Sequence, residues 1–328
     1  MVRSIRRDSE NKTLSFFPAP YPDECYYSVL CRYMVHSGLP STANALLELF
    51  GREIGPASTL MMPYMSSSAS RWAELESGIT EDVIVREHTA YHYFSIVYRK
   101  KEAENLLDRM RNGKKCGCRM NYRSSLATSG LRYCPMCAYE EKVDYGEMYW
   151  HRTHQLKGVR YCTKHRIELA DSGITLRKIK RSFVPASFAL GSLYKTSLEE
   201  LGCKRKPVSY EYLEKYKAVE RDLTWLMKHG DSVQGLEHVI ARYEDELHKR
   251  KLTDDRYKDR ITEMKLLKES FTEYHGGGFL KELEVGKHEF LEWKSAPSIV
   301  ARFLSPLEHV LMMEFLCGSV PAFFGEHS

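Results

Sequence analysis

The chain has 328 residues, of which 43% are hydrophobic and 28% charged, with a formal net charge of +5 at pH 7. This composition is typical of a folded globular protein and excludes an intrinsically disordered one. The length exceeds the size at which a single hydrophobic core usually stops growing, so we expect two or three subdomains. The sequence has neither a run of roughly 20 apolar residues nor the apolar core of a signal peptide, so we expect a cytoplasmic chain that binds no membrane.

The nine cysteines do not favour a secreted disulfide framework. Their number is odd, the chain is long, and four candidates fall into the spacing of metal ligands. We therefore expect reduced thiols and bound metal.

Residues 1–15 are polar and basic without an apolar period, and we expect a flexible arm there. The prolines in Pro18-Ala-Pro20-Tyr21-Pro22 predict an extended segment. Asp23 is then expected to cap a helix with apolar residues at helical spacing, and a second helix is predicted from Ser41 to Phe50, ending at Gly51. Two helices so closely connected can read DNA as a helix-turn-helix, or can simply pack together, and the sequence leaves both interpretations open.

Residues 66–112 are predicted to be helical in pieces, one of them starting at Thr80, where Glu81 and Asp82 favour the helix dipole. From Arg99 to Arg123 the chain carries nine Lys or Arg residues against three acidic ones. This surplus of six exceeds the whole net charge and would suit contact with nucleic-acid phosphates, although a solvated helix face is the alternative.

Two residue pairs have the spacing of a zinc site: Cys134-Pro-Met-Cys137 and Cys162-Thr-Lys-His165. A Cys-x-x-Cys turn directs two thiolates toward one point, and the second pair completes a tetrahedral set. Four protein ligands leave no open coordination position, so the predicted Zn²⁺ is structural rather than catalytic.

A second zinc site is a weaker hypothesis. It would use Cys116 and Cys118 with a histidine from among His88, His92, His151 and His154, but the pair lacks a partner pair at metal spacing. The remaining cysteines are interpreted as small core residues: Cys25, Cys31, Cys203 and Cys317.

From about Ser197 the pattern is helical again, with long charged segments at Tyr210–Lys228 and Gln234–Lys251. The run Gly276–Gly278 indicates a flexible joint. Ser305 and Glu308 form a predicted capping box that opens the apolar helix Leu307–Leu316.

The predicted fold is mainly α. It comprises a flexible arm (1–15), a helical N-terminal subdomain with the helix-turn-helix-like pair (16–112), a Cys₃His zinc-finger module (113–175) and a helical C-terminal subdomain (176–328). No Ser-His-Asp arrangement, glycine-rich phosphate loop or catalytic metal motif is found in the sequence, so we expect no enzymatic activity.

The residues around the zinc pairs resemble the TniQ family, which includes the TnsD transposition proteins. The resemblance rests on Arg132-Tyr-Cys134-Pro-x-Cys137, on Tyr145-Gly-Glu147-x-Tyr149-Trp150-His151-Arg152-x-His154-Gln155-Leu156-x-Gly158-Val159, and on Cys162-x-Lys-His165. The opening Pro20-Tyr-Pro-Asp23-Glu24-x-x-Tyr27-Ser28, followed by Arg32, looks like the start of the same family. A segment beginning at Pro306-Leu-x-His309 looks like longer TnsD-type members.

This resemblance implies a bacterial, nucleoid-associated protein that selects DNA targets for transposition and recruits the AAA+ ATPase TnsC. It implies a short member or a C-terminally truncated one, since longer members carry further sequence that reads a fixed attachment site. The alternative is a protein-interaction scaffold that links an RNA-guided CRISPR effector to the transposition machinery without reading DNA.

For double-stranded DNA, the expected phosphate contacts are basic residues of the strip and of the zinc segment, since lysine and arginine are seldom buried. They are Arg109, Arg111, Lys114, Lys115, Arg119, Arg123, Arg152, Lys157, Arg160 and Lys164. Tyr149 and Trp150 could stack on bases, but we favour packing within the small zinc module, which needs large aromatic side chains to build a core.

Overall fold

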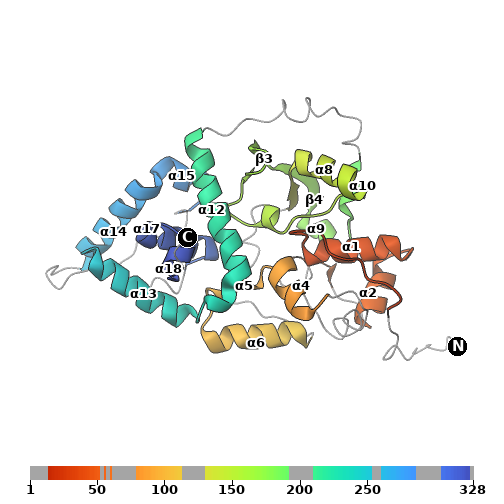
Figure 1. Cartoon of the computed structure of the whole chain (residues 1–328), viewed down its shortest axis with the longest axis horizontal. Coiled ribbons are helices and arrows are strands. Elements are labelled where there is room, and N and C mark those ends of the chain that lie inside the picture. The colour runs from red at the N-terminus through yellow and green to blue at the C-terminus, as the bar shows by residue number, and fades with distance from the viewer. Residues whose placement is uncertain are drawn as a thin grey trace.

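The computed structural model describes residues 14–51, 55–56, 60, 79–112, 130–191, 210–252, 260–285 and 304–325. Figure 1 shows a mainly helical molecule in which helix α12 (Tyr210–His229) lies between two groups of elements. The N-terminal helices and the strands lie on one side of α12, and the C-terminal helices lie on the other. No helix in the described ranges is long and apolar enough to cross a membrane.

The first two helices are α1 (Tyr26–His36) and α2 (Thr42–Phe50). Ser41 caps α2 by accepting a hydrogen bond from the Asn44 amide, and Gly51 ends it in the left-handed conformation, as the sequence predicts. The predicted cap of the first helix is wrong, because Cys25 rather than Asp23 occupies the N-cap position. Asp23 has a φ of 56°, and its carboxylate instead accepts a hydrogen bond from the Thr153 amide, which lies between the two predicted zinc-ligand pairs.

Residues 1–13 of the predicted flexible arm lie outside the described residues, and Leu14, near its end, is buried in the core. The next helices are α4 (Glu81–His88), α5 (Tyr91–Ser95) and α6 (Lys100–Arg111). Thr80 caps α4 as predicted, accepting from the Val83 amide.

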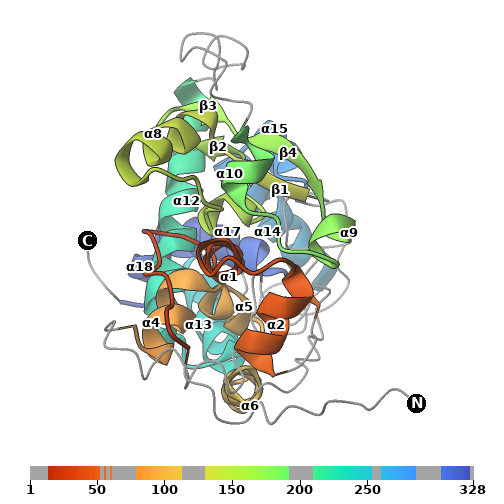
Figure 2. The ribbon, with the colours of Figure 1, turned by 90° about the vertical axis from the view of Figure 1, so that its right-hand side faces the viewer.

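Two short antiparallel sheets frame the cysteine segment. One pairs β1 (Gly130–Tyr133) with β4 (Ala170–Thr175), and the other pairs β2 (Tyr161–Cys162) with β3 (Ile167–Glu168). Between β1 and β2 lie helix α8 (Pro135–Tyr145) and a 3-10 turn, η2 (Thr153–Gln155). Helices α9 (Leu176–Ile179) and α10 (Ala186–Ala189) follow β4 (Figure 2).

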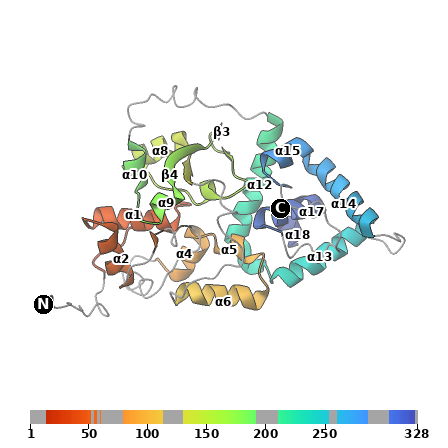
Figure 3. The same cartoon turned by 180° about the vertical axis from the view of Figure 1, so that it is seen from behind.

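The C-terminal group follows α12 with η4 (Gly230–Ser232), α13 (Leu236–Lys249), α14 (Arg260–His275), α15 (Gly277–Glu282), α17 (Pro306–Cys317) and α18 (Val320–Phe323). The capping box of α17 is present as predicted, with the Ser305 and Glu308 side chains bonded to each other's backbone amides. Ten of the twelve residues of α17 are buried, so this helix is a core element of the C-terminal group (Figure 3).

The prediction of a flexible joint at Gly276–Gly278 is wrong. Gly276, with a φ of 84°, is the N-cap of α15, and Gly277 and Gly278 begin that helix. A Cβ at Gly278 would lie 2.5 Å from the Tyr212 hydroxyl oxygen. The glycines therefore permit a tight turn and a close helix contact.

Candidate metal centre

The two predicted ligand pairs come from two tight local structures. Cys134 follows β1 and is the N-cap of α8, with Pro135 at the first helical position and Cys137 in the first turn. Cys162 ends β2, and His165 lies in the turn that leads to β3. Arg166 has a φ of 57°, and its amide donates to the Cys162 carbonyl at 2.7 Å, which closes this turn.

The structure brings all four predicted ligand atoms together, each within 4.8 Å of the others. His165 Nδ1 lies 3.4 Å from Cys134 Sγ, 3.3 Å from Cys137 Sγ and 3.5 Å from Cys162 Sγ. The Cys137 and Cys162 sulfur atoms are 3.7 Å apart. In a tetrahedral site with ordinary zinc bond lengths, the sulfur–sulfur edge is about 3.8 Å and the sulfur–nitrogen edge about 3.5 Å. The donor set therefore fits zinc without rearrangement.

A carboxylate orients the histidine of this cluster. Glu140 Oε1 lies 2.9 Å from His165 Nε2, the ring nitrogen that faces away from the thiols. A carboxylate on the second nitrogen fixes the tautomer that presents the first one to a metal, as is usual for zinc-binding histidines. Sequence reasoning did not identify Glu140, although its position one helical turn after Cys137 is the available signal.

The thiols share their hydrogen bonds unequally. The pKa of Cys137 is raised, because its hydrogen bonds to Cys134 and Cys162 and its burial favour the neutral thiol. The pKa of Cys162 is lowered, because Cys134 and Cys137 donate hydrogen bonds to its thiolate. A divalent cation would favour ionisation of all three thiols.

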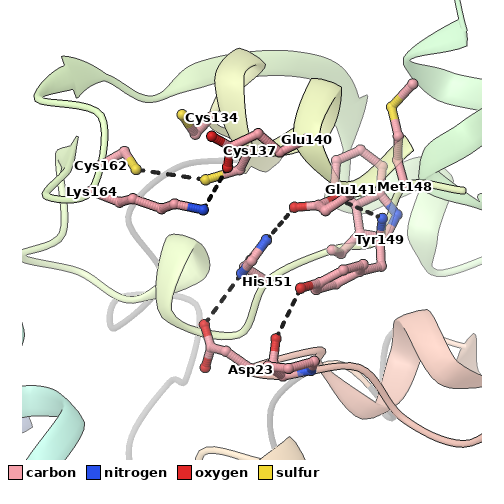
Figure 4. A network of polar contacts seen from close by, with 12 residues as sticks. Asp23, Cys134, Cys137, Glu140, Glu141, Met148, Tyr149, His151, Cys162 and Lys164 are labelled. Atoms are coloured by element: carbon pink, nitrogen blue, oxygen red, sulfur yellow. Dashed lines mark hydrogen bonds and ion pairs between the residues drawn. The ribbon is translucent and has the colours of Figure 1, made fainter. Parts of the chain in front are cut away.

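A second polar network ties this module to the N-terminal segment (Figure 4). His151 lies between two carboxylates, with Nε2 2.5 Å from Glu141 Oε1 and Nδ1 3.6 Å from Asp23 Oδ2. Burial alone would lower the pKa of His151, but the hydrogen bonds and charges of Asp23 and Glu141 outweigh it and raise the pKa to about 10. The imidazolium therefore forms part of a partly buried ion-pair network.

Cys137, Glu141 and His151 also lie within 4.8 Å of one another. Glu141 already binds His151 through Oε1 and accepts from the Tyr149 amide through Oε2 at 3.2 Å. The Cys₃His cluster, in which four ligand-to-ligand distances match the edges of a tetrahedral zinc site, is the better metal site.

Another buried network connects the segment before α1 and helix α1 itself to Glu147. Arg32 Nη1 lies 2.8 Å from Glu24 Oε2, and its Nε lies 2.8 Å from Glu147 Oε1. Burial raises the pKa of Glu24 to about 7 even though Arg32 opposes this shift. Glu24 also forms an isolated β-bridge with His151, so this segment and the zinc segment form one unit.

Several predicted DNA contacts are engaged within the protein. The prediction for Arg152 is wrong, because this side chain is 2% exposed and donates to Asp23 and to the carbonyls of Arg86 and Thr89. Other predicted contacts are exposed or half-buried but have acidic partners: Arg111 with Glu81 and Asp82, Arg160 with Glu168 and Glu282, and Lys164 with Glu140.

The other predicted contacts fall into two groups. Arg109 and Lys157 are half-buried. Four more lie outside the described residues: Lys114, Lys115, Arg119 and Arg123.

The aromatic residues of the zinc segment pack inside the protein, as favoured from the sequence. Trp150 is fully buried and donates from Nε1 to the Val184 carbonyl at 2.8 Å, and Tyr149 is 5% exposed. Neither presents a free face for stacking on a base.

The hypothesis of a second zinc site is not tested by the described part of the chain. Cys116, Cys118 and Cys203 lie outside it. His88 is buried and lies 2.7 Å from the Glu24 carbonyl. Cys25 and Cys31 are buried core residues as expected, whereas Cys317 is half-buried.

Comparison with known proteins points to one family. Residues 15–169 match the TniQ family. Over 154 residues the chain is 29% identical to the transposon Tn7 transposition protein TnsD of Escherichia coli. The aligned segment covers 45% of this chain but 30% of that relative, so the similarity concerns less than a third of the longer protein.

Proposed function

The chain belongs to the TniQ/TnsD family, and on this premise we propose that it is a target-selection adaptor of DNA transposition that contacts duplex DNA and recruits an AAA+ ATPase of the TnsC type. Family membership supports the target-selection role and agrees with the expectation of a non-enzymatic protein. Direct contact with duplex DNA and recruitment of the ATPase go beyond family membership, and we propose them for this chain.

The proposal rests on the side-chain contacts that hold together residues 15–169, the segment that matches the TniQ family. His151 and Arg152 both connect the zinc segment to Asp23 near the chain start, across more than a hundred residues of sequence. Arg152 is buried and His151 is largely covered, and both bind protein partners, so we infer that they stabilise this part of the protein as a rigid platform rather than act on a substrate. Such a platform suits a protein that binds two macromolecules.

We propose that the platform holds one structural Zn²⁺ through Cys134, Cys137, Cys162 and His165. The ion would supply fold stability, since binding free energy becomes folding free energy when the unfolded chain lacks the site. With all four positions taken by protein ligands, it would offer no site for substrate or water.

The test of the adaptor role is a pull-down with the cognate ATPase in the presence and absence of duplex DNA. The adaptor role predicts that the tagged chain retains the ATPase, and that duplex DNA increases the amount retained. Retention of the ATPase without any effect of DNA would favour the second candidate, a scaffold joined to an RNA-guided effector. Failure to retain the ATPase under either condition would contradict both.

A further inference from the structure

A short basic segment that sequence reasoning did not select lies just after strand β4. It comprises Arg177, Lys178, Lys180 and Arg181, on α9 and the two residues after it, and all four are exposed. We call these residues the α9 cations. Four positive charges within five consecutive positions repel one another, so their exposure side by side calls for an explanation.

Several basic residues predicted to contact DNA have acidic partners, whereas the α9 cations have none within the described part of the chain. Among the described residues, no carboxylate lies within ion-pair distance of any of the four. Between Ala170 and Leu190 the sequence has one acidic residue, Asp171, and its Oδ1 accepts a hydrogen bond from the Gly173 amide at 2.8 Å. Arg111, Arg160 and Lys164, in contrast, are each paired.

The backbone that carries the α9 cations is firmly held. Ile179 is fully buried and Phe183 is 4% exposed, so both anchor the segment in the core. The Tyr27 hydroxyl donates to the Ser182 carbonyl at 3.0 Å and accepts from the Val184 amide at 2.9 Å. These contacts hold the backbone that carries the charges, and the four side chains therefore project from a defined surface.

The turn geometry places the charges on one side. Backbone hydrogen bonds continue past α9, from the Lys180 amide to the Leu176 carbonyl and from the Ser182 amide to the Lys178 carbonyl. At about 100° per residue, the four cations span about 160° of the helix circumference, with Ile179 on the opposite side. The side that faces solvent is therefore uniformly positive.

The segment that carries the α9 cations lies near the start of α2 (Figures 2 and 3). The Phe183 amide donates to Thr42 Oγ1 at 3.0 Å, and Thr42 is the first residue of α2. The exposed positions near the start of α2 are uncharged: Ala43, Asn44 and Leu47. The helix N-terminus adds a partial positive charge to the same region.

We propose that the α9 cations and the start of α2 form a surface that binds the phosphate backbone of duplex DNA. Closely spaced phosphates are a ligand that several neighbouring cations fit when, as among the described residues here, no carboxylate neutralises them, and a duplex carries one negative charge per about 1.7 Å of its axis. The uncharged start of α2 can then approach a groove, which supports the helix-turn-helix interpretation of α1 and α2. This inference rests on the proposed DNA contact and specifies where it occurs.

The test measures binding of a short mixed-sequence DNA duplex by fluorescence anisotropy, between about 50 mM and about 200 mM salt. The variant Arg177→Gln/Lys178→Gln/Lys180→Gln/Arg181→Gln removes the α9 cations. If each contacts one phosphate, the slope of log affinity against log salt becomes less steep by about 3 to 4, and affinity at the lower salt falls at least about tenfold. The charge-retaining variant Lys178→Arg/Lys180→Arg keeps affinity within about twofold, because it preserves both charges.

The matched control is Arg86→Gln/Lys217→Gln/Lys249→Gln/Lys265→Gln, which removes four cations that have acidic neighbours. Each quadruple variant lowers the formal net charge from +5 by four, to +1. Loss of affinity confined to the first variant supports the surface. Equal loss in both, unchanged binding by the first, or no duplex binding by the unmodified chain overturns it.

Two further measurements distinguish failure of the proposed DNA-binding surface from failure of the adaptor role. Tighter binding of the same surface to a duplex RNA or to an acidic peptide than to duplex DNA would overturn the DNA assignment. Retention of the ATPase without DNA is measured on both quadruple variants. If the first variant loses duplex affinity but keeps the ATPase, the inference stands and the adaptor role is unaffected; if the unmodified chain does not retain the ATPase, the adaptor role fails independently.

Discussion

The Arg152 side chain lies in the interior of the protein, where it binds three partners. Its guanidinium lies 3.2 Å from Asp23 Oδ1, 2.6 Å from the Arg86 carbonyl and 2.8 Å from the Thr89 carbonyl. These partners come from the segment before α1 and from the end of α4, so one side chain joins three parts of the chain. The general rule that arginine is seldom buried misled the prediction, because spacing along the sequence does not reveal a carboxylate 129 residues away.

We expect Arg152→Ala to lower the free energy of unfolding by about 3 to 5 kcal/mol, since it leaves Asp23 and two carbonyls without their buried donor. Urea denaturation measures this loss. Arg160→Gln is the control, because the Arg160 side chain is 42% exposed and its ion pair should contribute less than about 1 kcal/mol. A stable Arg152→Ala protein with weakened DNA binding would show that Arg152 contacts DNA after all.

At the scale of elements, the cysteine pairs are held where strands meet turns. The Cys-x-x-Cys and Cys-x-x-His spacings alone predicted which four side chains converge, because each pair is shaped by its own local turn. Helix α8 was not predicted, since its apolar residues do not follow a helical stripe and its start is set by Pro135 and the ligand turn. The carboxylates that support the site were not predicted either, because they depend on contacts between elements.

Metal analysis of the purified chain tests the Cys₃His site. We expect one zinc per chain in the unmodified protein, and loss of that zinc together with lower thermal stability in Cys162→Ser. Cys317→Ser is the matched control, because Cys317 is a free, half-buried cysteine at the end of α17 and should leave the zinc in place. Unmodified protein without zinc would refute the site, and a second equivalent would point to Cys116 and Cys118.

The packing of α14 against α17 should depend on pH through His275. This side chain is 4% exposed, its Nε2 lies 2.9 Å from the Leu311 carbonyl, and burial lowers its pKa to about 4. Above pH 6.5 the ring is neutral in the folded and the unfolded chain alike. As the pH falls from 6.5 toward 4, the unfolded chain takes up a proton that the folded one does not, so stability is lost over that window.

We expect the free energy of unfolding of the unmodified protein to fall relative to His275→Gln by up to about 3 kcal/mol between pH 7 and pH 4. Glu314, whose pKa is raised by burial, lies 4.0 Å from His275 and shifts stability in the opposite direction. It is present in both proteins, so the comparison isolates the histidine. Urea denaturation of both proteins at several pH values gives the difference, and equal pH dependence in the two would contradict the prediction.

At the scale of the whole molecule, one close contact joins residues 15–169, the segment that matches the TniQ family, to the C-terminal helices. Gly158 has a φ of 98°, and a Cβ there would lie 2.7 Å from Leu307 Cδ1 and 3.4 Å from Val219 Cγ1. Leu307 belongs to α17 and Val219 to α12, and both are buried. The sequence predicted the helix that contains Leu307 from its capping box and apolar run, but not its packing against Gly158, because periodicity identifies a buried face without identifying its neighbour.

Substitution of Gly158 should therefore weaken the connection between the two sides of the molecule that α12 separates in Figure 1. We expect Gly158→Ala to lower the free energy of unfolding by about 2 to 4 kcal/mol, from a strained backbone and an overpacked contact with Leu307. Gly173→Ala is the matched control, since Gly173 has a φ of 72° and open space around it, so only the backbone effect of about 1 kcal/mol applies. Both variants are compared by urea denaturation and by limited proteolysis of the C-terminal helices. Equal losses in the two variants would show that the two sides are stabilised independently, whereas a larger loss in Gly158→Ala with early cleavage after α12 would show that the platform and the C-terminal helices fold as one unit.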